Sequence, residues 1–373
     1  MKTPWPASTN YPISTLEATS WTDSMSEFQY CFYGQLNLVL NSGGHAGYEK
    51  YFNNEYQLIS QSNNLNPSAP LIKVGIVREL PPPSDHEIRT IKDRRKLFSF
   101  SYVIRGIDTD EVEIYFCQHF MDKLYINAVA VFLQAQVLEP LMYYKLLQRG
   151  VLLMHAAGVT DGKAGYLFPA HGGTGKTTLS IALLAHGFKL LGDDLLFIDT
   201  NKGVVHPYPR PLHLFTYNIN SLQNASVPFH YRTAIYFKNI IRYCLKLLYR
   251  TEFLISTRVH AQEIFSDDPF GSSVPYRSIG FLVKEGPTHS CVEIDSNNVE
   301  MLTSEILHSA DLNESLYILL KSSPLQSRVV TRERQLVDKL LRQFPHISYI
   351  NTRAMALDQL VPSLVECLRE RQQ

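Results

Sequence analysis

The sequence predicts an α/β protein with two domains, a small β-rich α+β domain at residues 25–149 and a larger α/β domain at residues 150–373. Three observations predict this division. The first part is rich in aromatic and β-branched residues that alternate in part with polar ones, as half-buried strands require. The second part begins after Gly150 with short apolar runs, and it contains a glycine-rich segment between a predicted strand and a predicted helix. With 373 residues, of which 45% are hydrophobic, the chain can bury two cores.

The composition excludes several classes of protein. Lys plus Arg equals Asp plus Glu at 35 each, so no overall charge attracts the chain to nucleic acid or to a membrane. Five scattered cysteines without a C-x-x-C pair argue against a disulfide framework and a structural zinc site, and they indicate buried thiols in a reducing compartment. The stretch "MKTPWPASTNYPIS" lacks the apolar core of a secretory signal, and "INAVAVFLQAQVL" is too short and too polar to span a bilayer. We therefore expect a cytoplasmic protein without membrane spans; a homo-oligomer stays open.

The elements of the first part follow from local patterns. Residues 1–24 contain three prolines and many Ser and Thr residues without periodicity, which predicts a loose tail. The runs "FQYCFYGQLNLVL" and "EVEIYFCQHF" predict strands, and "NLNPSAP" and "RELPPPSDHE" between them predict loops. Residues 128–147 have apolar residues at helical spacing, and Pro140 predicts that this helix is bent or broken.

The second part begins with a predicted hairpin. The runs "VLLMHAAGV" and "AGYLFPA" predict two strands, and Asp161-Gly162 between them is a hairpin turn signal. "KTTLSIALLAHG" predicts a short helix that ends at Gly187, and "FKLLGDDLLFID" predicts a strand pair around an acidic point. Further on we expect strands in "VVHPYPRPLHLF" and "SIGFLVKE" and helices in "EMLTSEILHSADL" and "ALDQLVPSLVECLRERQ".

The glycine-rich segment "FPAHGGTGKTTLS" has the pattern of a phosphate-binding loop. A loop between a strand and a helix directs several backbone N–H groups at one point, where the helix N-terminus adds positive potential. Lys176 would bind the β- and γ-phosphates of a nucleotide, and the Thr177 hydroxyl would bind Mg²⁺. Ala170 stands where the pattern asks for glycine, but it removes no N–H donor. The predicted phosphate-binding residues are Ala170, His171, Gly172, Gly173, Thr174, Gly175, Lys176, Thr177 and Thr178.

Three further residues complete a predicted site. Asp193 and Asp194 follow the first helix of the second part, at the end of the next predicted strand. Two carboxylates beside a nucleotide can divide the work: Asp193 would hold Mg²⁺, and Asp194 would take a proton from an attacking hydroxyl. His155 ends the preceding predicted strand, and the hairpin would return it beside the loop. His155, Lys176, Asp193 and Asp194 are the predicted catalytic residues, and Thr177 and Asp193 are the predicted metal ligands.

These residues resemble a known family. The run "MHAAGVTDGKAGYLFPAHGGTGKTTLSIALLAHGFKLLGDD" is similar to the core of the HPr kinase/phosphorylase superfamily, and "GGTGKTTLS" also resembles the nucleotide loop of ATP-dependent phosphoenolpyruvate carboxykinase, which shares that fold. More weakly, "HPYPRPLHL" looks like a segment of stand-alone HPr-kinase-like proteins associated with peptide modification. The resemblance implies a phosphoenolpyruvate-carboxykinase-like P-loop domain that uses ATP and Mg²⁺ to phosphorylate a serine-type hydroxyl. By position, His155 and Asp194 match catalytic residues, Lys176 the phosphate-binding lysine and Thr177 a Mg²⁺ ligand.

Several alternatives stay open at this point. Thr178 stands where bifunctional HPr enzymes carry an acidic residue, which argues against phosphorylase activity, and Arg210 and Arg277 are both candidates for a catalytic arginine. A carboxykinase would need a Lys, His and Asp manganese site, and a GTPase would need an N-K-x-D motif; neither is found. A non-catalytic nucleotide-binding sensor or scaffold is the alternative outside enzymes. The acceptor of a kinase could be a protein serine, a peptide serine or a small-molecule alcohol.

A basic stripe predicts a docking surface or a solvated helix face. In "YFKNIIRYCLKLLYR" cations recur every four residues, and the apolar residues Ile240, Ile241, Leu247 and Leu248 would lie towards another face of the helix. The sequence alone favours a solvated face, and the sharper hypothesis is docking of an acidic or phosphorylated substrate. The stripe consists of Lys238, Arg242, Lys246 and Arg250.

Overall fold

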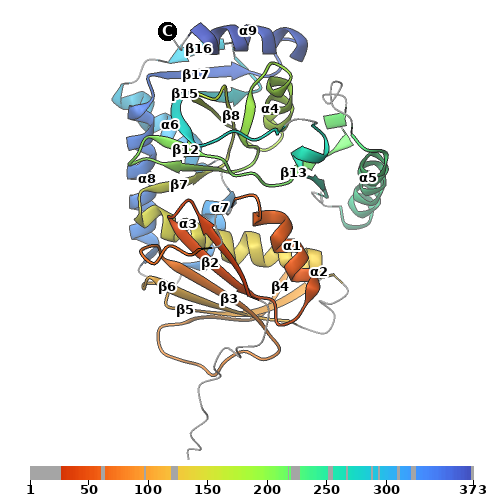
Figure 1. Cartoon of the computed structure of the whole chain (residues 1–373), viewed down its shortest axis with the longest axis vertical. Helices are drawn as coiled ribbons and strands as arrows, with labels where there is room; N and C mark the ends of the chain where they lie inside the picture. Colours follow the sequence, from red (N-terminus) through yellow and green to blue (C-terminus); the bar gives the residue numbers. More distant parts are fainter. Residues whose placement is uncertain are drawn as a thin grey trace, which may run out of the picture.

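The computed structural model describes most of the chain from residue 27 to residue 370. The gaps are at residues 60–63, 96–97, 119–124, 217, 220–226, 251–254, 266–267, 287–288, 293–294, 309–310 and 321–324. The predicted tail at residues 1–24 lies outside the described residues. Within them the chain folds into an α/β protein with two mixed sheets, as the sequence predicts (Figure 1).

The first sheet has six described strands at the lower end of the molecule in Figure 1. In sheet order they are β1 (Glu27–Phe32), β2 (Leu36–Asn41), β3 (Leu71–Val77), β6 (Glu111–Cys117), β5 (Phe98–Arg105) and β4 (Ile88–Arg95). β3 pairs in parallel with β2 and β6, and the other pairings are antiparallel. A parallel pair needs a crossover, which α1 (Ala46–Tyr56) makes between β2 and β3. The predicted strands in this part are confirmed, whereas α1 is an addition that the sequence did not predict.

The second sheet has nine described strands and begins directly after Gly150. Its main path runs β10-β8-β9-β15-β12-β11-β7, while β17 pairs with β15 and β16. β15 is parallel to β9 and to β17, and the other pairings are antiparallel. The strands are β7 (Val151–Met154), β8 (Ala156–Thr160), β9 (Gly165–Pro169), β10 (Lys189–Gly192), β11 (Leu196–Asp199), β12 (Val204–His206), β15 (Val274–Val283), β16 (His289–Val292) and β17 (His346–Asn351).

Helices cover this sheet, and a small two-stranded sheet stands beside it. The covering helices are α4 (Lys176–Leu184), α6 (Ser296–His308), α8 (Leu325–Gln343) and α9 (Leu357–Glu370), whereas α7 (Asp311–Leu319) packs against α3 (Glu139–Gln148). The small sheet pairs β13 (Leu212–Leu214) with β14 (Thr257–Val259), and α5 (Phe229–Tyr249) lies between these strands in the chain. The predicted β8–β9 hairpin and α4 are confirmed. The two strands predicted in "FKLLGDDLLFID" also form, but they are not paired with each other: β10 pairs with β8, and β11 pairs with β7 and β12. The predicted helix in "EMLTSEILHSADL" is wrong in extent, because α6 ends at His308 and α7 begins at Asp311.

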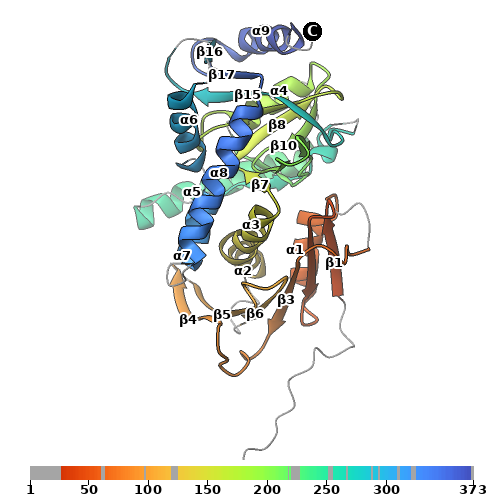
Figure 2. The ribbon, with the colours of Figure 1, turned by 90° about the vertical axis from the view of Figure 1, so that its left-hand side faces the viewer.

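A long helical run lies between the two sheets (Figures 1 and 2). It consists of α2 (Ile126–Leu133), a π-helical turn (Gln134–Leu138) and α3 (Glu139–Gln148). Pro140 does not break it; the π turn before the proline accommodates the missing N–H and the ring. The run Ile126–Gln148 is therefore longer than predicted. Among the described residues it is the one helical run that is long and apolar enough to cross a membrane, but 61% of its most apolar stretch is buried inside the protein.

One apolar cluster extends through both parts of the molecule. It joins Leu38 and Val74 of the first sheet, Leu141 of α3, and Leu153 and Phe281 of the second sheet. Because these side chains pack in one cluster, the two parts share a core instead of burying it separately. A second cluster lies within residues 157–368 around α4, α9 and the small sheet.

A buried ion cluster also crosses from one part to the other. Arg210 lies between two carboxylates, with Nη2 3.0 Å from Oε2 of Glu55 and Nη1 2.8 Å from Oε1 of Glu139. Arg258 binds the second oxygen of Glu55 at 2.6 Å. The carboxylates come from α1 and α3, and the arginines from the second part. Arg210 is thus held in a structural ion cluster between the two parts.

Removing Arg210 tests this cluster. Arg210→Met leaves Glu55 and Glu139 buried with one cation fewer, so we expect a loss of about 3–5 kcal/mol in the free energy of unfolding. The matched control is Arg334→Met, because Arg334 pairs with Glu300 at a similar 2.9 Å but on the surface. That change should cost less than about 1 kcal/mol. Urea unfolding measures both, and equal losses would contradict the assigned role of Arg210.

Candidate functional site

The glycine-rich loop, residues 170–175, connects the end of β9 to the start of α4. Gly175 is the residue before α4 and has φ 103°, a conformation that side chains rarely adopt, so the glycine is required there. Ala170 does not lie in the left-handed region, since the described non-glycine residues with positive φ are all elsewhere. Alanine therefore fits this position without strain. His171, Gly172 and Gly173 are exposed, so the tip of the loop is open to a ligand.

Contacts from inside and outside the loop hold its shape. The buried Lys176 ammonium donates to the carbonyl of Ala170 at 2.7 Å, and the Thr174 hydroxyl donates to the carbonyl of His171 at 2.6 Å. Thr352, directly after β17, donates its hydroxyl to the carbonyl of Thr174 at 2.8 Å. The cation of Lys176 thus lies within the curve of the loop, bound to the carbonyls of Ala170 and His171.

Asp193 faces the start of α4. Its Oδ2 accepts a hydrogen bond from Oγ1 of Thr177 at 2.9 Å. Gly192 permits this turn, because a Cβ there would lie 2.5 Å from the carbonyl oxygen of Leu195. A register shift between Leu190 and Gly192 interrupts the pairing of β10 with β8, which resumes at Gly192 and ends there. The strand therefore ends with Asp193 beside the start of α4.

Asp194 faces the other way and contacts His155. Nε2 of His155 lies 3.3 Å from Oδ1 of Asp194, and the Asp194 side chain is half exposed. The sequence predicted one strand through His155, and this is wrong: β7 pairs with β11, β8 pairs with β9 and β10, and His155 stands between them. The change of partner strand frees His155 from the ladders and places it beside Asp194.

The pKa values of the two adjacent carboxyls shift in opposite directions. Burial and the charge of Asp194 raise the pKa of Asp193 to about 7, against the hydrogen bond from Thr177. Burial also acts to raise the pKa of Asp194, but the hydrogen bond and charge of His155 outweigh it and hold this pKa well below its usual range. Lys176 and His155 both act on Asp193, so these charged groups form one electrostatic unit.

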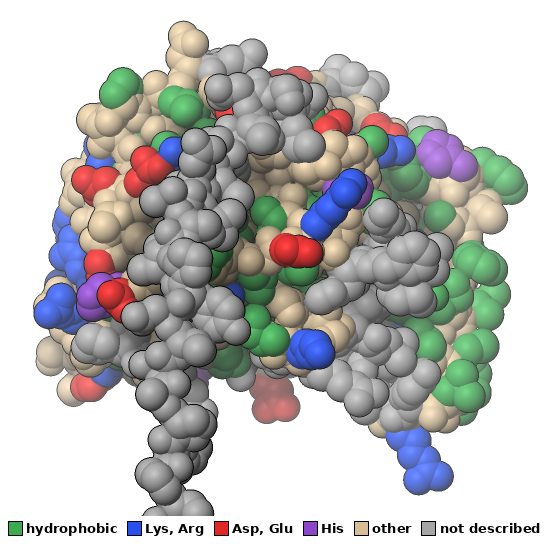
Figure 3. All heavy atoms as spheres, turned by 90° about the horizontal axis from the view of Figure 1, so that it is seen from below, with side chains coloured by type: hydrophobic (Ala, Val, Ile, Leu, Met, Phe, Trp, Pro, Cys, Tyr) green, Lys and Arg blue, Asp and Glu red, His purple; other side chains and the backbone are tan. Residues whose placement is uncertain are grey.

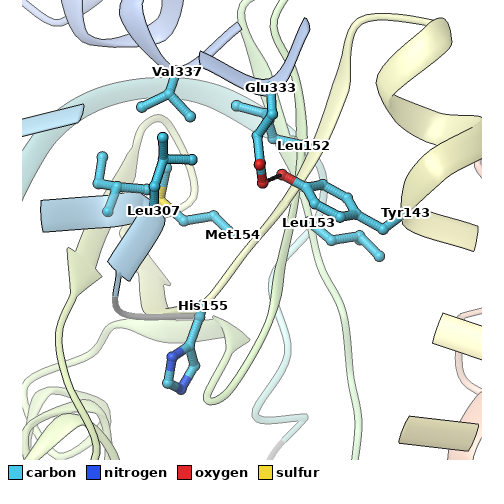
Figure 4. Close-up of a pocket in the computed structure, with 9 residues that line it drawn as sticks. Tyr143, Leu152, Leu153, Met154, His155, Leu307, Glu333 and Val337 are labelled. Carbon is cyan, nitrogen blue, oxygen red and sulfur yellow. Dashed lines mark hydrogen bonds between the residues drawn. The ribbon is translucent and has the colours of Figure 1, made fainter. Parts of the chain in front are cut away.

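The space behind His155 is not the ligand site. Figure 4 shows the imidazole pointing away from Glu333 and Tyr143, which are hydrogen-bonded to each other at 2.6 Å. The cavity between them and Met154 measures about 10 Å³, room for about one water molecule. That cavity is too small for a nucleotide, whereas Asp194 and the tip of the loop are open to solvent.

The two candidate arginines lie elsewhere. Arg210 is held between Glu55 and Glu139, although its charge contributes to the low pKa of Asp194. Arg277 lies near the start of β15, where β15 pairs with the first residues of β9, at the far end of that strand from the loop. Neither arginine therefore reaches the loop as a direct phosphate ligand in this structure.

Three residues near the site were missed from the sequence. Thr352 supports the loop at Thr174, and the buried Asn218 donates from Nδ2 to Oγ1 of Thr178 at 3.4 Å. His213 on β13 interacts electrostatically with Asp194, and burial lowers the pKa of His213 to about 4 against the effect of that carboxylate. Of these three, only His213 lies in a segment that the sequence had singled out, "HPYPRPLHL".

Thr177 and Asp193 fit a magnesium ion that is held jointly with phosphate oxygens. Oδ1 of Asp193 is buried and has no hydrogen-bond partner among the described residues, which is costly unless a ligand binds it. Mg²⁺ in proteins is often bound by one or two carboxylates together with substrate phosphates. In the part of the chain that the structure describes, no group of three or more His, Cys, Asp or Glu side chains is placed to hold a metal ion by itself.

No protein-family model matches the chain, and no curated protein is significantly similar to it. The site's own chemistry therefore has to indicate the function. It brings together an exposed loop of backbone donors, one buried lysine, a hydroxyl–carboxylate pair and a histidine–carboxylate pair. This set can bind an anion, hold a divalent cation and orient a hydroxyl group.

The opposite pKa shifts predict opposite effects of removing each carboxylate. The pKa of Asp193 rises from 3.8 in the unfolded chain to about 7, so ionisation in the folded protein costs stability increasingly between about pH 4 and 7. Asp193→Asn should thus raise the Tm of the metal-free protein at pH 8 and leave it unchanged near pH 4. Asp194 has a lowered pKa and stabilises the fold above its unfolded pKa, so Asp194→Asn should lower the Tm at pH 8. Thermal melts in EDTA from pH 4 to 8 measure both, and shifts of the same sign would refute the assignment.

Proposed function

We propose that the protein is an ATP-dependent kinase that transfers the γ-phosphoryl group to a hydroxyl, most simply the hydroxyl of a serine in a protein or peptide. The observation that carries the proposal is the division of labour between Asp193 and Asp194. One carboxylate faces the hydroxyl of Thr177 at the start of α4, and its neighbour faces His155 on the exposed side. Phosphoryl transfer needs one group that binds the metal and the phosphates and, next to it, a second group that orients the acceptor hydroxyl.

The loop side supports binding of ATP. Exposed backbone at His171, Gly172 and Gly173 and the N-terminus of α4 favour a polyphosphate, and Lys176 adds a positive charge from within the loop. Thr177 and Asp193 would hold Mg²⁺, which neutralises charge on the phosphate oxygens when bound. The order of hairpin, loop, helix and acidic turn agrees with the resemblance to the HPr kinase/phosphorylase superfamily, and we propose a nucleotide-binding domain of that type.

The acceptor side supports orientation of a hydroxyl. The pKa of Asp194 lies below its usual range, so this carboxylate is ionised at neutral pH and is a weak base. A phosphoryl transfer with a loose transition state needs the acceptor held in line more than it needs a strong base. Asp194 would therefore accept a hydrogen bond from the acceptor hydroxyl, while His155, bound to the same carboxylate, holds it in place and adds positive charge nearby.

Loss of Lys176 should weaken nucleotide binding and transfer together. Lys176→Ala removes the buried cation of the loop, and we expect phosphoryl transfer from γ-labelled ATP to fall by at least about 100-fold. The control is Lys163→Ala, an exposed lysine in the β8–β9 turn, which should leave the rate unchanged. Candidate acceptors for the assay are a serine-containing protein, short serine peptides and small alcohols, all with Mg²⁺. Equal rates for Lys176→Ala and the wild type would contradict the proposed role of the loop.

Asp194→Asn separates a kinase from a nucleotide sensor. Asp194 lies on the acceptor side, so the variant should bind a fluorescent ATP analogue within about threefold of the wild type. Its phosphoryl transfer should be lost by at least about 100-fold. Should the wild type bind ATP tightly but phosphorylate none of the three acceptor classes, the sensor interpretation replaces the kinase.

A further inference from the structure

Helix α5 turns its apolar side away from the protein. The sequence predicts that its apolar residues lie towards a separate face, and the structure leaves that face open: Phe237 is 62% exposed and Leu248 is 75% exposed. α5 projects from the second part of the molecule (Figures 1 and 2), and hydrophobic side chains gather along the edge where it lies (Figure 3). We call this surface the α5 apolar face; it consists of Tyr236, Phe237, Ile240, Tyr243, Leu247 and Leu248.

The same helix carries only positive charges. Residues 229–250 contain five Lys or Arg residues and no Asp or Glu. The whole chain is neutral, so this short segment holds an excess of positive charge that the rest of the chain balances. The cations are Arg232, Lys238, Arg242, Lys246 and Arg250.

The predicted basic stripe winds around the helix instead of forming one face. Four residues advance roughly 40° beyond a full turn, so successive cations in the stripe move around the axis. Lys238 and Arg242 are half-buried: Nζ of Lys238 donates to the carbonyl of Ser256 at 3.0 Å, and Arg242 lies over the ring of Phe215. Lys246 and Arg250 are exposed and flank the α5 apolar face.

We propose that α5 is an interfacial helix that binds the surface of a membrane containing anionic lipids. An amphipathic helix with Lys and Arg beside an exposed apolar and aromatic face lies in the plane of the interface, with its apolar side among the acyl chains. Exposed cations next to that face are attracted by anionic headgroups. Charge selects this occupant over a second copy of the chain. Two copies joined through α5 would bring together the exposed cations Arg232, Lys246 and Arg250 of each copy, without a single acid from either helix. The helix binds the surface of the bilayer and does not cross it.

Vesicle binding tests the proposal with the full chain. Co-sedimentation with vesicles of 70% phosphatidylcholine and 30% phosphatidylglycerol should retain the wild type, whereas pure phosphatidylcholine vesicles should bind it at least about tenfold less. The double variant Phe237→Ser/Leu248→Ser should lose at least about tenfold in affinity for the anionic vesicles, since each change removes an apolar side chain from the interface. The matched control is Met301→Ser, because Met301 on α6 is also exposed (49%) but stands apart from α5.

A second readout locates the contact. Cys244 is exposed on α5, so an environment-sensitive dye on its thiol should shift to the blue on anionic vesicles, with labelled Cys244→Ser as the background. The proposal is overturned if the wild type binds neither vesicle, or if the double variant binds as tightly as Met301→Ser. It is also overturned if the lipid-free wild type is a dimer that the double variant dissociates, because a second copy would then cover the face. Phosphoryl transfer to a soluble acceptor by the double variant should stay at the wild-type rate, so the outcome is independent of the proposed kinase activity.

Discussion

The buried pairing of Arg210 with Glu55 and Glu139 is the interaction on which the arrangement of the two parts depends. A buried charge is stable only when it is paired and hydrogen-bonded, so neither the arginine nor the carboxylates can be separated cheaply once the apolar cluster around them has closed. The carboxylates belong to helices of the first part and Arg210 to the second. The same charge contributes to the low pKa of Asp194. Docking of the two parts and the electrostatics of the candidate site are therefore linked through one side chain.

The sequence predicted well where structure is set by neighbours in the chain. Short patterns predict three features: the hairpin turn at Asp161-Gly162, the loop before Lys176 and the acidic turn after β10. The structure has the hairpin and the acidic turn at the predicted positions. It could not predict features that depend on distant partners. Thr352 reaches the loop from a strand at the other end of the second part, and the break at His155 depends on which strands pair with β7 and β8. The catalytic and ligand roles of the predicted site residues remain predictions; these residues are His155, Lys176, Thr177, Asp193 and Asp194.

The contrast between Asp193 and Asp194 shows why adjacent identical residues need not have identical chemistry. Neighbouring side chains in an extended turn point to opposite sides, so the two carboxyls enter different surroundings. Asp193 has a buried, unpartnered oxygen and one hydroxyl donor, which favours the neutral acid until a cation is bound. Asp194 has an imidazole and solvent, which favour the ionised form. A site of this kind gains most from a ligand that brings a divalent cation to the first carboxyl and a hydrogen-bond donor to the second.

The inverted orientation of α5 has a structural cause and a consequence for the site. The helix is fixed to the protein by the buried Ile235 and by two polar anchors, the Lys238 bond to Ser256 and the Arg242 contact with Phe215, and its α5 apolar face is left to point outward. The residues that hold these two cations also contact residues near the site. Ser256 contacts Nδ1 of His213 at 3.3 Å, and the backbone N–H of Phe215 donates a hydrogen bond to Oδ1 of Asn218. A helix that bound a membrane through its apolar face would thus rest on the segment that contributes His213 and Asn218.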